Sequence, residues 1–321
     1  MKSAVVVAVL TVLSCDLCLA QPYPGKAIRF IVPYAPGGGT DITARAIAQK
    51  LTGALGQPVV VENRSGAGGI VGTDAAAKAQ PDGYTIVIGT TGPLAINPSM
   101  YSKLPYDVFR DFAPISLIAT APHVLVVHPS LPSRSVKELV ALAKRRPSQL
   151  TFSSGGIGGS NHLSAEMFNV MAQVQTVHVP YRGAGPAVIA VVSGEVSFAF
   201  LDVLATLPHV KSRRLRGLAV TGAKRSNAAP ELPTMAEAGL PGYLSGVWYG
   251  ILAPARTPKE IIDRLNHEVV RALRDDEIRA RMTAEGTEVV ASSPDEFAKF
   301  IKTENERWAR VVRQARVRAD S

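Results

Sequence analysis

Three segments of the sequence each combine a short apolar strand pattern, a glycine-rich loop and a helical pattern, in that order. They span residues 28–55, 150–171 and 176–192, and the step Val-Pro-Tyr occurs in the first and again in the third. The first N–H groups of a helix have no partner inside the helix and carry partial positive charge, so loops of this kind attract anions. The pattern predicts a cleft that is assembled from several such loops and binds a carboxylate.

Strand patterns alternate with helical patterns along almost the whole sequence, which is typical of an α/β fold whose mostly parallel sheets carry helices on their faces. The chain is longer than one core comfortably holds, so two lobes are expected. The apolar run 115–128 and the segment Trp248–Pro254 are predicted to cross between them. We expect residues 22–123 and 247–321 to form lobe 1, residues 124–246 to form lobe 2, and the two crossings to act as a hinge.

Residues 1–20 have the features of an export signal. Lys2 precedes the apolar run Ala4–Leu13, and Ala20 marks the expected cleavage site. The apolar run is too short to span a bilayer, which takes about 20 residues. An alternative makes Cys15 a lipid attachment site. With a cleaved signal we expect a soluble mature protein in the periplasm, and in either case the product lies outside the inner membrane.

Both cysteines, Cys15 and Cys18, lie in this signal, so the mature chain offers no thiol for a disulfide, a nucleophile or a metal site. The formal net charge of +9 suits anionic partners. Much of the positive charge falls on predicted helix faces, where exposure to solvent explains it, and no aromatic residues are interleaved with it. We therefore expect no nucleic-acid partner.

The first loop contains the run Gly37-Gly38-Gly39-Thr40-Asp41. Glycines let a backbone approach a ligand closely, Thr40 could cap the following helix, and Asp41 complements the helix dipole. An ordinary helix entry needs one glycine and a cap, so three consecutive glycines favour ligand contact. We predict contacts from Gly38, Gly39, Thr40 and Asp41.

The second loop offers three hydroxyls and four glycines between Ser153 and Ser160. Hydroxyls and backbone N–H groups can hold a carboxylate without the desolvation penalty of an enclosed ion pair. We predict ligand contacts from Ser153, Ser154, Gly158 and Ser160. His162 lies just inside the following helix, where it either contacts the ligand or simply packs against the loop.

The third loop contributes Tyr181, Arg182 and Gly183 to the predicted site. Arg182 could reach an anionic ligand or lie exposed in solvent. Tyr34 and Tyr181 both follow a Val-Pro step, and each could wall the cleft or pack inside its lobe. Their matched positions beside glycine loops favour the cleft, and we interpret the repeated step as pseudo-symmetry between the lobes.

An enzyme of the dinucleotide-binding class is the alternative in a different functional class. Ser65–Gly72 follows an apolar strand, but its spacing is Gly-x-Gly-x-x-x-Gly and the next strand ends in Thr90-Thr91 instead of an acid. The six histidines form no metal-binding helix pattern, and neither a nucleotide-triphosphate loop nor an esterase elbow occurs. We predict no catalytic residue, no cofactor and no metal, and keep a dinucleotide-dependent oxidoreductase as the alternative.

Six ordered blocks of the sequence resemble the Bug family, the TctC-type extracytoplasmic solute receptors of tripartite tricarboxylate transporters. The blocks are residues 31–41, 61–69, 81–84, 153–163, 178–183 and 233–239. The match extends over nearly the whole mature chain, and six blocks in the same order make the resemblance specific.

The resemblance implies a two-lobed periplasmic-binding-protein fold of the Venus flytrap, type II-like kind, and we expect a monomer. It implies that Tyr34–Asp41 and Ser153–His162 hold a ligand carboxylate, often through water, and that Thr90 and the Arg182-Gly183 turn line the rest of the pocket. The function implied is a receptor, not an enzyme, that delivers a small carboxylate to the membrane subunits of a tripartite transporter. The ligand classes are dicarboxylates, tricarboxylates, acidic amino acids and aromatic carboxylates, and a receptor that signals to a sensor kinase is the alternative.

The sequence departs from the family pattern at two positions. Arg213 stands where glycine is usual, and Ser197 replaces the common acid or amide. Ser197 precedes Phe198–Asp202, a segment expected to form the pocket floor. We predict that Asp202 chooses between an amine-bearing ligand and a plain carboxylate.

Overall fold

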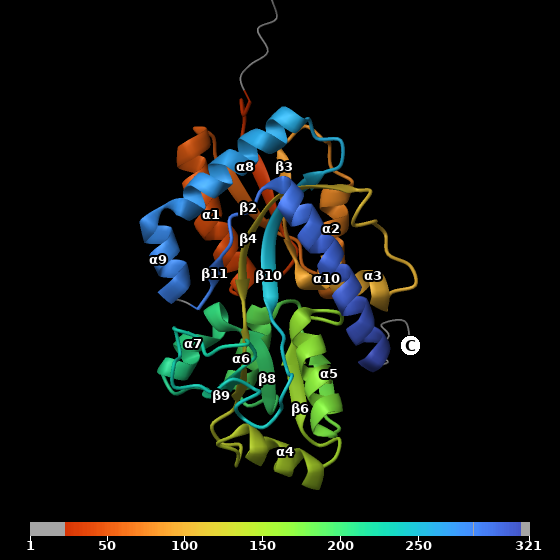
Figure 1. Ribbon diagram of the computed structural model, residues 1–321, viewed down its shortest axis with the longest axis vertical. Coiled ribbons are helices and arrows are strands. Elements are labelled where there is room, and N and C mark those ends of the chain that lie inside the picture. The colour runs from red at the N-terminus through yellow and green to blue at the C-terminus, as the bar shows by residue number, and fades with distance from the viewer. Residues whose placement is uncertain (1–22, 285, 316–321) are drawn as a thin grey trace, which may run out of the picture.

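The computed structural model describes residues 23–284 and 286–315 and has two lobes, one above the other in Figure 1. The predicted export signal lies outside these described residues. Each lobe is built around one β-sheet with helices on both faces, so the predicted two-lobed α/β fold is confirmed. Within the described residues, no helix is long and apolar enough to cross a membrane.

The first lobe has a six-stranded sheet in the order β11-β4-β10-β3-β1-β2, and the second has a five-stranded sheet in the order β7-β6-β8-β5-β9. The strands are β1 (Ile28–Val32), β2 (Val59–Asn63), β3 (Thr85–Thr90), β4 (Phe112–Ala121), β5 (His123–Val127), β6 (Thr151–Ser154), β7 (Val177–Pro180), β8 (Phe198–Asp202), β9 (Arg216–Val220), β10 (Val247–Pro254) and β11 (Glu288–Val289).

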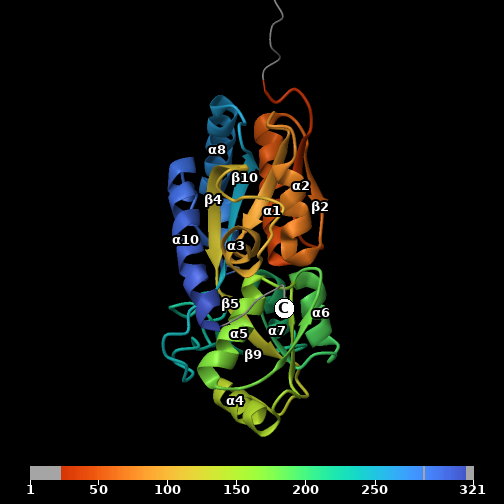
Figure 2. The ribbon, with the colours of Figure 1, turned by 90° about the vertical axis from the view of Figure 1, so that its right-hand side faces the viewer.

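Helices cover both faces of each sheet (Figures 1 and 2). In the first lobe they are α1 (Gly39–Leu55), α2 (Ile70–Ala77), α3 (Asn97–Met100), α8 (Lys259–Arg274), α9 (Asp276–Ala284) and α10 (Pro294–Ala315), with the short turns η1 (Ala67–Gly69) and η2 (Gly92–Ile96). In the second lobe they are α4 (Val136–Arg145), α5 (Ser160–Ala172), α6 (Ala184–Val192) and α7 (Val203–Lys211).

The alternation of side chains along the strands sends them into different cores. Phe30 and Val32 of β1 share one buried core with α1 and α8. Ile31, between them, belongs to another core with α2 and α10. In the second lobe, Phe198 of β8 packs with α4 and α5, whereas Ala199 packs with α6 and α7. Because successive side chains of a strand point to opposite faces, apolar strands like these must be covered on both sides.

The two sheets have the same topology apart from β11, which the first sheet adds at its edge. Read from one edge, the first sheet runs β2-β1-β3-β10-β4 and the second runs β7-β6-β8-β5-β9. In both, the strand in fourth place, β10 or β5, is the one that enters from the other lobe. Strand β6 therefore corresponds to β1, and β7 corresponds to β2. The two Val-Pro-Tyr steps follow β1 and close β7, which are not equivalent strands. The interpretation of this repeat as pseudo-symmetry is wrong; the true equivalent of the loop after β1 is the serine-glycine loop after β6.

The sheets are less parallel than predicted. Strand β1 pairs in parallel with β2 and β3, and β6 with β7 and β8. Every pair that involves a strand from a crossing, β4, β5, β9 or β10, is antiparallel. A strand that continues straight from one lobe into the other enters the second sheet without a helical crossover, so its direction is not fixed by the βαβ rule.

The lobes are joined where two chain segments cross side by side. The long apolar run divides at Pro122 into β4 of the first sheet and β5 of the second, and Val247 at the start of β10 pairs with Ala121. On the second-lobe side, Thr221 N donates to His123 O at 3.0 Å and Ser245 N donates to Thr221 O at 3.1 Å. These hydrogen-bonded crossings join the lobes, and we propose that they act as a hinge, with the limits 123/124 and 246/247 as the boundaries of the lobes.

Candidate ligand-binding site

A small cavity of about 30 Å³ lies between the lobes. It is lined by Tyr34, Gly38, Thr40, Thr90, Gly155, Gly159, Ser160, Asn161, Ala184, Asp202 and Val247. The lining comes from both lobes and from the crossing strand β10. It includes no Lys or Arg, so positive charge for an anion has to come from another source.

Three helices begin at this cavity. The residues that precede them are Gly38 before α1, Gly159 before α5 and Gly183 before α6, and none of the three helices has a side-chain cap. The first N–H groups of a helix need partners and carry partial positive charge. Their convergence directs partial positive charge from the backbone at the cavity, whose lining contains no Lys or Arg.

Loop 1, which we define as Tyr34–Gly38, is braced from behind by Asp41. The Asp41 carboxylate accepts hydrogen bonds from Gly37 N at 3.1 Å, Arg45 Nε at 3.0 Å and Asn63 Nδ2 at 2.9 Å. Burial alone would raise the pKa of Asp41, but the hydrogen bonds outweigh it and hold the pKa below its ordinary value. The charge of Asp41 thus fixes the loop and does not face the cavity.

Tyr34 is the aromatic wall of the cavity. Its hydroxyl lies 3.3 Å from Thr90 Oγ1 and donates to Gly68 O at 3.4 Å. Burial raises the pKa of Tyr34 above its ordinary value, so the hydroxyl stays protonated. Tyr34 and Thr90 therefore present neutral hydroxyl groups to the cavity.

Loop 2, which we define as Gly155–Gly159, is braced by two histidines. Gly158 N donates to His162 Nδ1 at 3.3 Å, and the His162 ring stacks on His178 with centroids 4.1 Å apart. His178 Nε2 lies 2.6 Å from Ser154 Oγ at the start of the loop. Burial lowers the pKa of His162 to about 3 and that of His178 to about 4, so both rings are neutral near pH 7.

Loop 3, which we define as Tyr181–Gly183, closes the seam between the lobes. Ala35 N of loop 1 donates to Arg182 O at 2.9 Å. A side chain added at Gly38 would meet Ala184 Cβ at 3.2 Å, so the two loops are in direct contact. The side chains of Tyr181 and Arg182 point elsewhere: the Tyr181 hydroxyl donates to Glu195 at 2.6 Å, and Arg182 is exposed.

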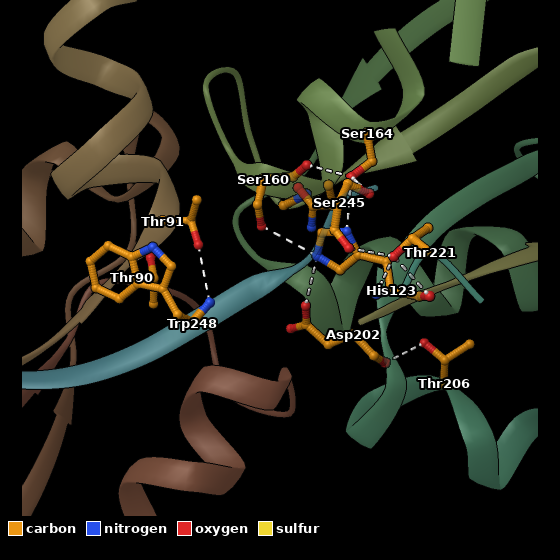
Figure 3. A network of polar contacts seen from close by, with 12 residues as sticks. Thr90, Thr91, His123, Ser160, Ser164, Asp202, Thr206, Thr221, Ser245 and Trp248 are labelled. Carbon is orange, nitrogen blue, oxygen red and sulfur yellow. Dashed lines mark hydrogen bonds and ion pairs between the residues drawn. The ribbon is translucent and has the colours of Figure 1, made fainter. Parts of the chain in front are cut away.

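The floor of the cavity holds an acid next to a buried histidine (Figure 3). Asp202 Oδ1 lies 3.4 Å from His123 Nε2, and both side chains are buried. His123 Nε2 is also 3.3 Å from Ser160 Oγ, and its Nδ1 is 2.9 Å from Ser164 Oγ. Gly39 packs against this floor, because an added Cβ would lie 2.6 Å from Tyr249 Oη. The network joins the floor, the first turns of α5 and His123 beside the crossing in one unit.

The structure brings only part of the predicted site to the cavity. The predicted residues that line the cavity are Tyr34, Gly38, Thr40, Thr90, Ser160 and Asp202. The predicted residues that lie behind or beside the cavity are Gly39, Asp41, Ser153, Ser154, Gly158, His162, Tyr181, Arg182 and Gly183. Ser153 shows the reason, since its hydroxyl donates to Ala187 O at 2.9 Å inside the second lobe.

Sequence reasoning missed several residues of the lining. They are Gly155, Gly159, Asn161, Ala184 and Val247. The helix-entry argument could have found Gly159, Asn161 and Ala184, because each flanks a helix N-terminus. No local signal marks His123, whose partners are distant in sequence. Across the described ranges, no group of His, Cys, Asp and Glu side chains is arranged to hold a metal ion.

The two departures from the family pattern have separate explanations. Arg213 has a φ of 59°, the left-handed conformation that glycine adopts most readily, so its backbone is strained there. Ser197 Oγ accepts a hydrogen bond from Thr151 N at 3.2 Å and links β6 to the start of β8, away from the cavity.

Residues 43–317 match the family described as tripartite tricarboxylate transporter family receptor, TctC. The chain belongs to this family. The Bug-type protein BugT of Bordetella pertussis is 40% identical over 296 residues, which make up 92% of this chain and 91% of BugT. The resemblance drawn from the six sequence blocks is thereby confirmed.

Two solved structures with bound ligands are similar to this TctC-family chain. R. palustris Rpa4515 with adipate has a TM-score of 0.90 and 37% identity, with 92% of this chain and 99% of that chain covered. MatC from Rhodopseudomonas palustris with bound malate has a TM-score of 0.87 and 32% identity, with 90% and 100% covered. The TctC family consists of periplasmic solute-binding receptors and not of enzymes, so the oxidoreductase alternative is wrong.

Proposed function

We propose that this receptor binds a small dicarboxylate between its lobes and delivers it to the membrane subunits of a tripartite transporter. The observation that carries this proposal is the convergence of three helix N-termini without side-chain caps on one cavity. Backbone N–H groups at such ends bind carboxylates, and the hydroxyls of Thr40 and Ser160 add donors beside them.

The floor of the cavity favours a plain or hydroxylated dicarboxylate over an acidic amino acid. An ammonium group would need a carboxylate that is not already neutralised. Asp202 Oδ1 faces His123, and Asp202 Oδ2 lies beside Gly39 at the N-terminus of α1, 2.8 Å from where a Cβ there would be. Both oxygens therefore already have close neighbours in the floor, and the partial positive charge at the start of α1 lies beside one of them. The similar structures with adipate and malate are consistent with this choice.

Ligand entry requires the lobes to separate. A cavity of about 30 Å³ has room for only one or two waters, whereas a dicarboxylate is several times larger. The two hydrogen-bonded crossings around Pro122 and Gly246 are where the lobes can pivot. We infer that the ligand enters an open form and is enclosed when loops 1, 2 and 3 meet.

Calorimetric titration of the mature protein with adipate, malate, succinate, glutamate and citrate tests the binding part of this proposal. We expect one equivalent of a dicarboxylate to bind and glutamate to bind at least about tenfold more weakly. In Asp202→Asn, the ranking of dicarboxylate above glutamate should persist. Binding of glutamate alone, with loss in Asp202→Asn, would overturn the dicarboxylate assignment.

Delivery needs a separate experiment. Uptake of the labelled dicarboxylate can be compared in cells that carry the two membrane subunits with and without this protein. We expect uptake only when the receptor and both subunits are present. Tight binding without any uptake would contradict delivery and leave the receptor assignment intact.

A further inference from the structure

A second and much larger hollow, of about 660 Å³, lies against the crossing strands, and apart from Val247 its lining shares no residue with the ligand cavity. Its walls come from both lobes: α9, β11 and α10 of the first, and residues 222–227 and 244–246 of the second. Its size is within the range of small-molecule sites, which is about 300–1,000 Å³. It plays no part in the cleft described above.

The hollow and the ligand cavity are separated by one residue of the hinge. Val247, the first residue of β10, lines both of them. Next to it, Gly246 is packed so closely that an added Cβ would lie 2.6 Å from Ala121 O in the other crossing segment. We infer that the lobes rotate about the two crossing segments, with the ligand cavity on one side of them (the front) and the hollow on the other (the back).

The lining of the hollow combines apolar surface with positive charge. Trp248 and Phe300 supply aromatic surface, and their rings meet edge to face at 5.6 Å. The basic residues in the lining are Lys224, Arg225, Arg279 and Arg307, whereas the acidic ones are Glu288 and Glu304. Glu304 is already occupied, since it accepts from Arg307 at 3.1 Å and from Trp308 Nε1 at 3.0 Å.

Several polar groups in the lining lack partners within the described residues, and the buried Trp248 Nε1 is one of them. The Thr287 hydroxyl is buried, with 2% of the residue exposed, and has no hydrogen-bond partner. The exposed Arg279 side chain makes no ion pair, unlike Arg225, which pairs with Glu237 at 2.9 Å. A buried hydroxyl and a guanidinium without partners are groups that an anionic ligand can satisfy.

We propose that this hollow is a second binding site, for an organic anion with an apolar or aromatic body, and that its occupancy favours the closed form of the receptor. Aromatic carboxylates and sulfonates have this chemistry. The anionic group would lie near Arg279 and Arg307 on the first lobe and Lys224 on the second, with the apolar body against Phe300 and Val247.

The coupling follows from the position of the pivot and rests on the proposed function of the front cavity. When the lobes rotate to open the front, the walls behind the crossings approach one another. Gly286 of the first lobe already lies close to Ser226 of the second, since an added Cβ would be 2.8 Å from its Oγ. An occupant of the hollow therefore opposes opening, and a ligand that binds the closed form better shifts the equilibrium toward it.

The site can be tested with 1-anilinonaphthalene-8-sulfonate, an aromatic anion whose fluorescence rises in apolar surroundings. We expect saturable binding of one equivalent, with energy transfer from Trp248. Arg279→Glu should lower the affinity for the probe about five- to tenfold, because it reverses one charge in the lining. The matched control is Lys302→Glu, the same charge reversal on an exposed position of α10 outside the lining, and should leave affinity within about twofold.

A second variant fills the hollow. Thr283 is exposed in the lining, so the Thr283→Trp protein should fold. Its indole takes up space in the hollow and should lower the affinity for the probe. The indole should also act as a permanent occupant and raise the affinity for adipate a few-fold, whereas Arg279→Glu should not. Mutual strengthening of adipate and probe in the unmodified protein would support the coupling.

Three outcomes would overturn the proposal. They are one-for-one competition between probe and adipate, probe affinity that is indifferent to both Arg279→Glu and Thr283→Trp, and adipate affinity that falls in Thr283→Trp. If no carboxylate binds at all, the front-site function fails, but the probe titrations still decide whether the hollow is a site.

Discussion

Loops 1 and 2 occupy equivalent places in the two lobes but are held by opposite chemistry. Each follows the first strand of its lobe, ends in a glycine and delivers a helix N-terminus to the cavity. Loop 1 is braced by a buried carboxylate, Asp41, that accepts charge-assisted bonds. Loop 2 is braced by stacked, neutral rings, His162 and His178.

The difference shows that a glycine loop leading into a helix N-terminus can be held in place in two ways, neither of which places the charge of the bracing residue in the cavity. The negative charge of Asp41 is matched by Arg45, whose side chain is half exposed at the edge of the lobe. The histidines contribute no charge near pH 7 because burial lowers the pKa of both. In both loops the helix ends supply the field for the ligand, and side chains fix only their position.

The largest effect is expected where loop 1 meets the floor. The residue that follows loop 1 is Gly39, and the equivalent residue after loop 2 is Ser160. The substitution Gly39→Ala would place a Cβ 2.6 Å from Tyr249 Oη and 2.8 Å from Asp202 Oδ2. Both neighbours are buried, so the floor must shift. Calorimetry with adipate should show a loss of affinity of about 100-fold, equivalent to about 3 kcal/mol.

Gly53→Ala, on the same helix, is the control for this change. Nothing lies within 4 Å of the added Cβ, and the position is exposed. It should stabilise the protein by about 0.5–1 kcal/mol and leave adipate binding unchanged. Equal affinities in the two variants would contradict the close packing of Gly39 on the floor.

The brace of loop 1 should matter for both stability and binding. Asp41→Ala leaves Gly37 N and Asn63 without their acceptor, and urea unfolding should show a loss of about 2–3 kcal/mol. Adipate affinity should fall about tenfold because the loop is no longer fixed. Asp263→Ala, which removes only the exposed ion pair to Lys259, should cost less than about 1 kcal/mol and leave binding intact.

The loops and the fold were predictable because their signals are local. A strand pattern, glycines and a helical pattern lie next to one another in the sequence, so the N-termini of α1, α5 and α6 could be located before the structure was known. The division at Pro122 likewise follows from an apolar run that is too long for one strand and is broken by a proline.

The direction of individual side chains was not predictable in the same way. Strand β7 is at the edge of its sheet, so Tyr181 turns outward to Glu195, while Tyr34 follows a central strand and enters the cavity. The Tyr side chains of the two Val-Pro-Tyr steps thus point in different directions because one step follows an interior strand and the other closes an edge strand. His123 depends on contacts with Ser160, Ser164 and Asp202, which lie 37 or more positions away in sequence, and no local pattern encodes them.

The brace of loop 2 should weaken in acid before that of loop 1. Unfolded histidines take up protons below about pH 6.5, whereas His178 and His162 do so in the folded protein only near pH 4 and pH 3. The unfolded state therefore binds more protons as the pH falls from about 6.5 to 4, and the stability of the folded state falls with it. Urea unfolding at pH 7.5 and 4.5 should show a loss of about 2 kcal/mol for each histidine.

His178→Phe tests the assignment of this pH dependence, because it keeps an aromatic ring in the stack and removes the titrating group. It should eliminate about half of the histidine contribution. A slope that His178→Phe does not change would show that other groups cause the loss in acid.

The smallest effect is expected from single hydroxyls, and it separates residues that line the cavity from those behind it. Ser160→Ala removes a donor at the N-terminus of α5 that lies on the cavity, so adipate affinity should fall about three- to tenfold. Ser153→Ala removes a bond to Ala187 O inside the second lobe and should lower stability by about 1 kcal/mol without changing affinity. The pair of variants needs both calorimetry and urea unfolding, because each measurement should respond to one serine only. If Ser153→Ala weakens adipate binding as much as Ser160→Ala does, the whole serine-glycine run contacts the ligand, and the division of residues 153–160 into those that line the cavity and those behind it is wrong.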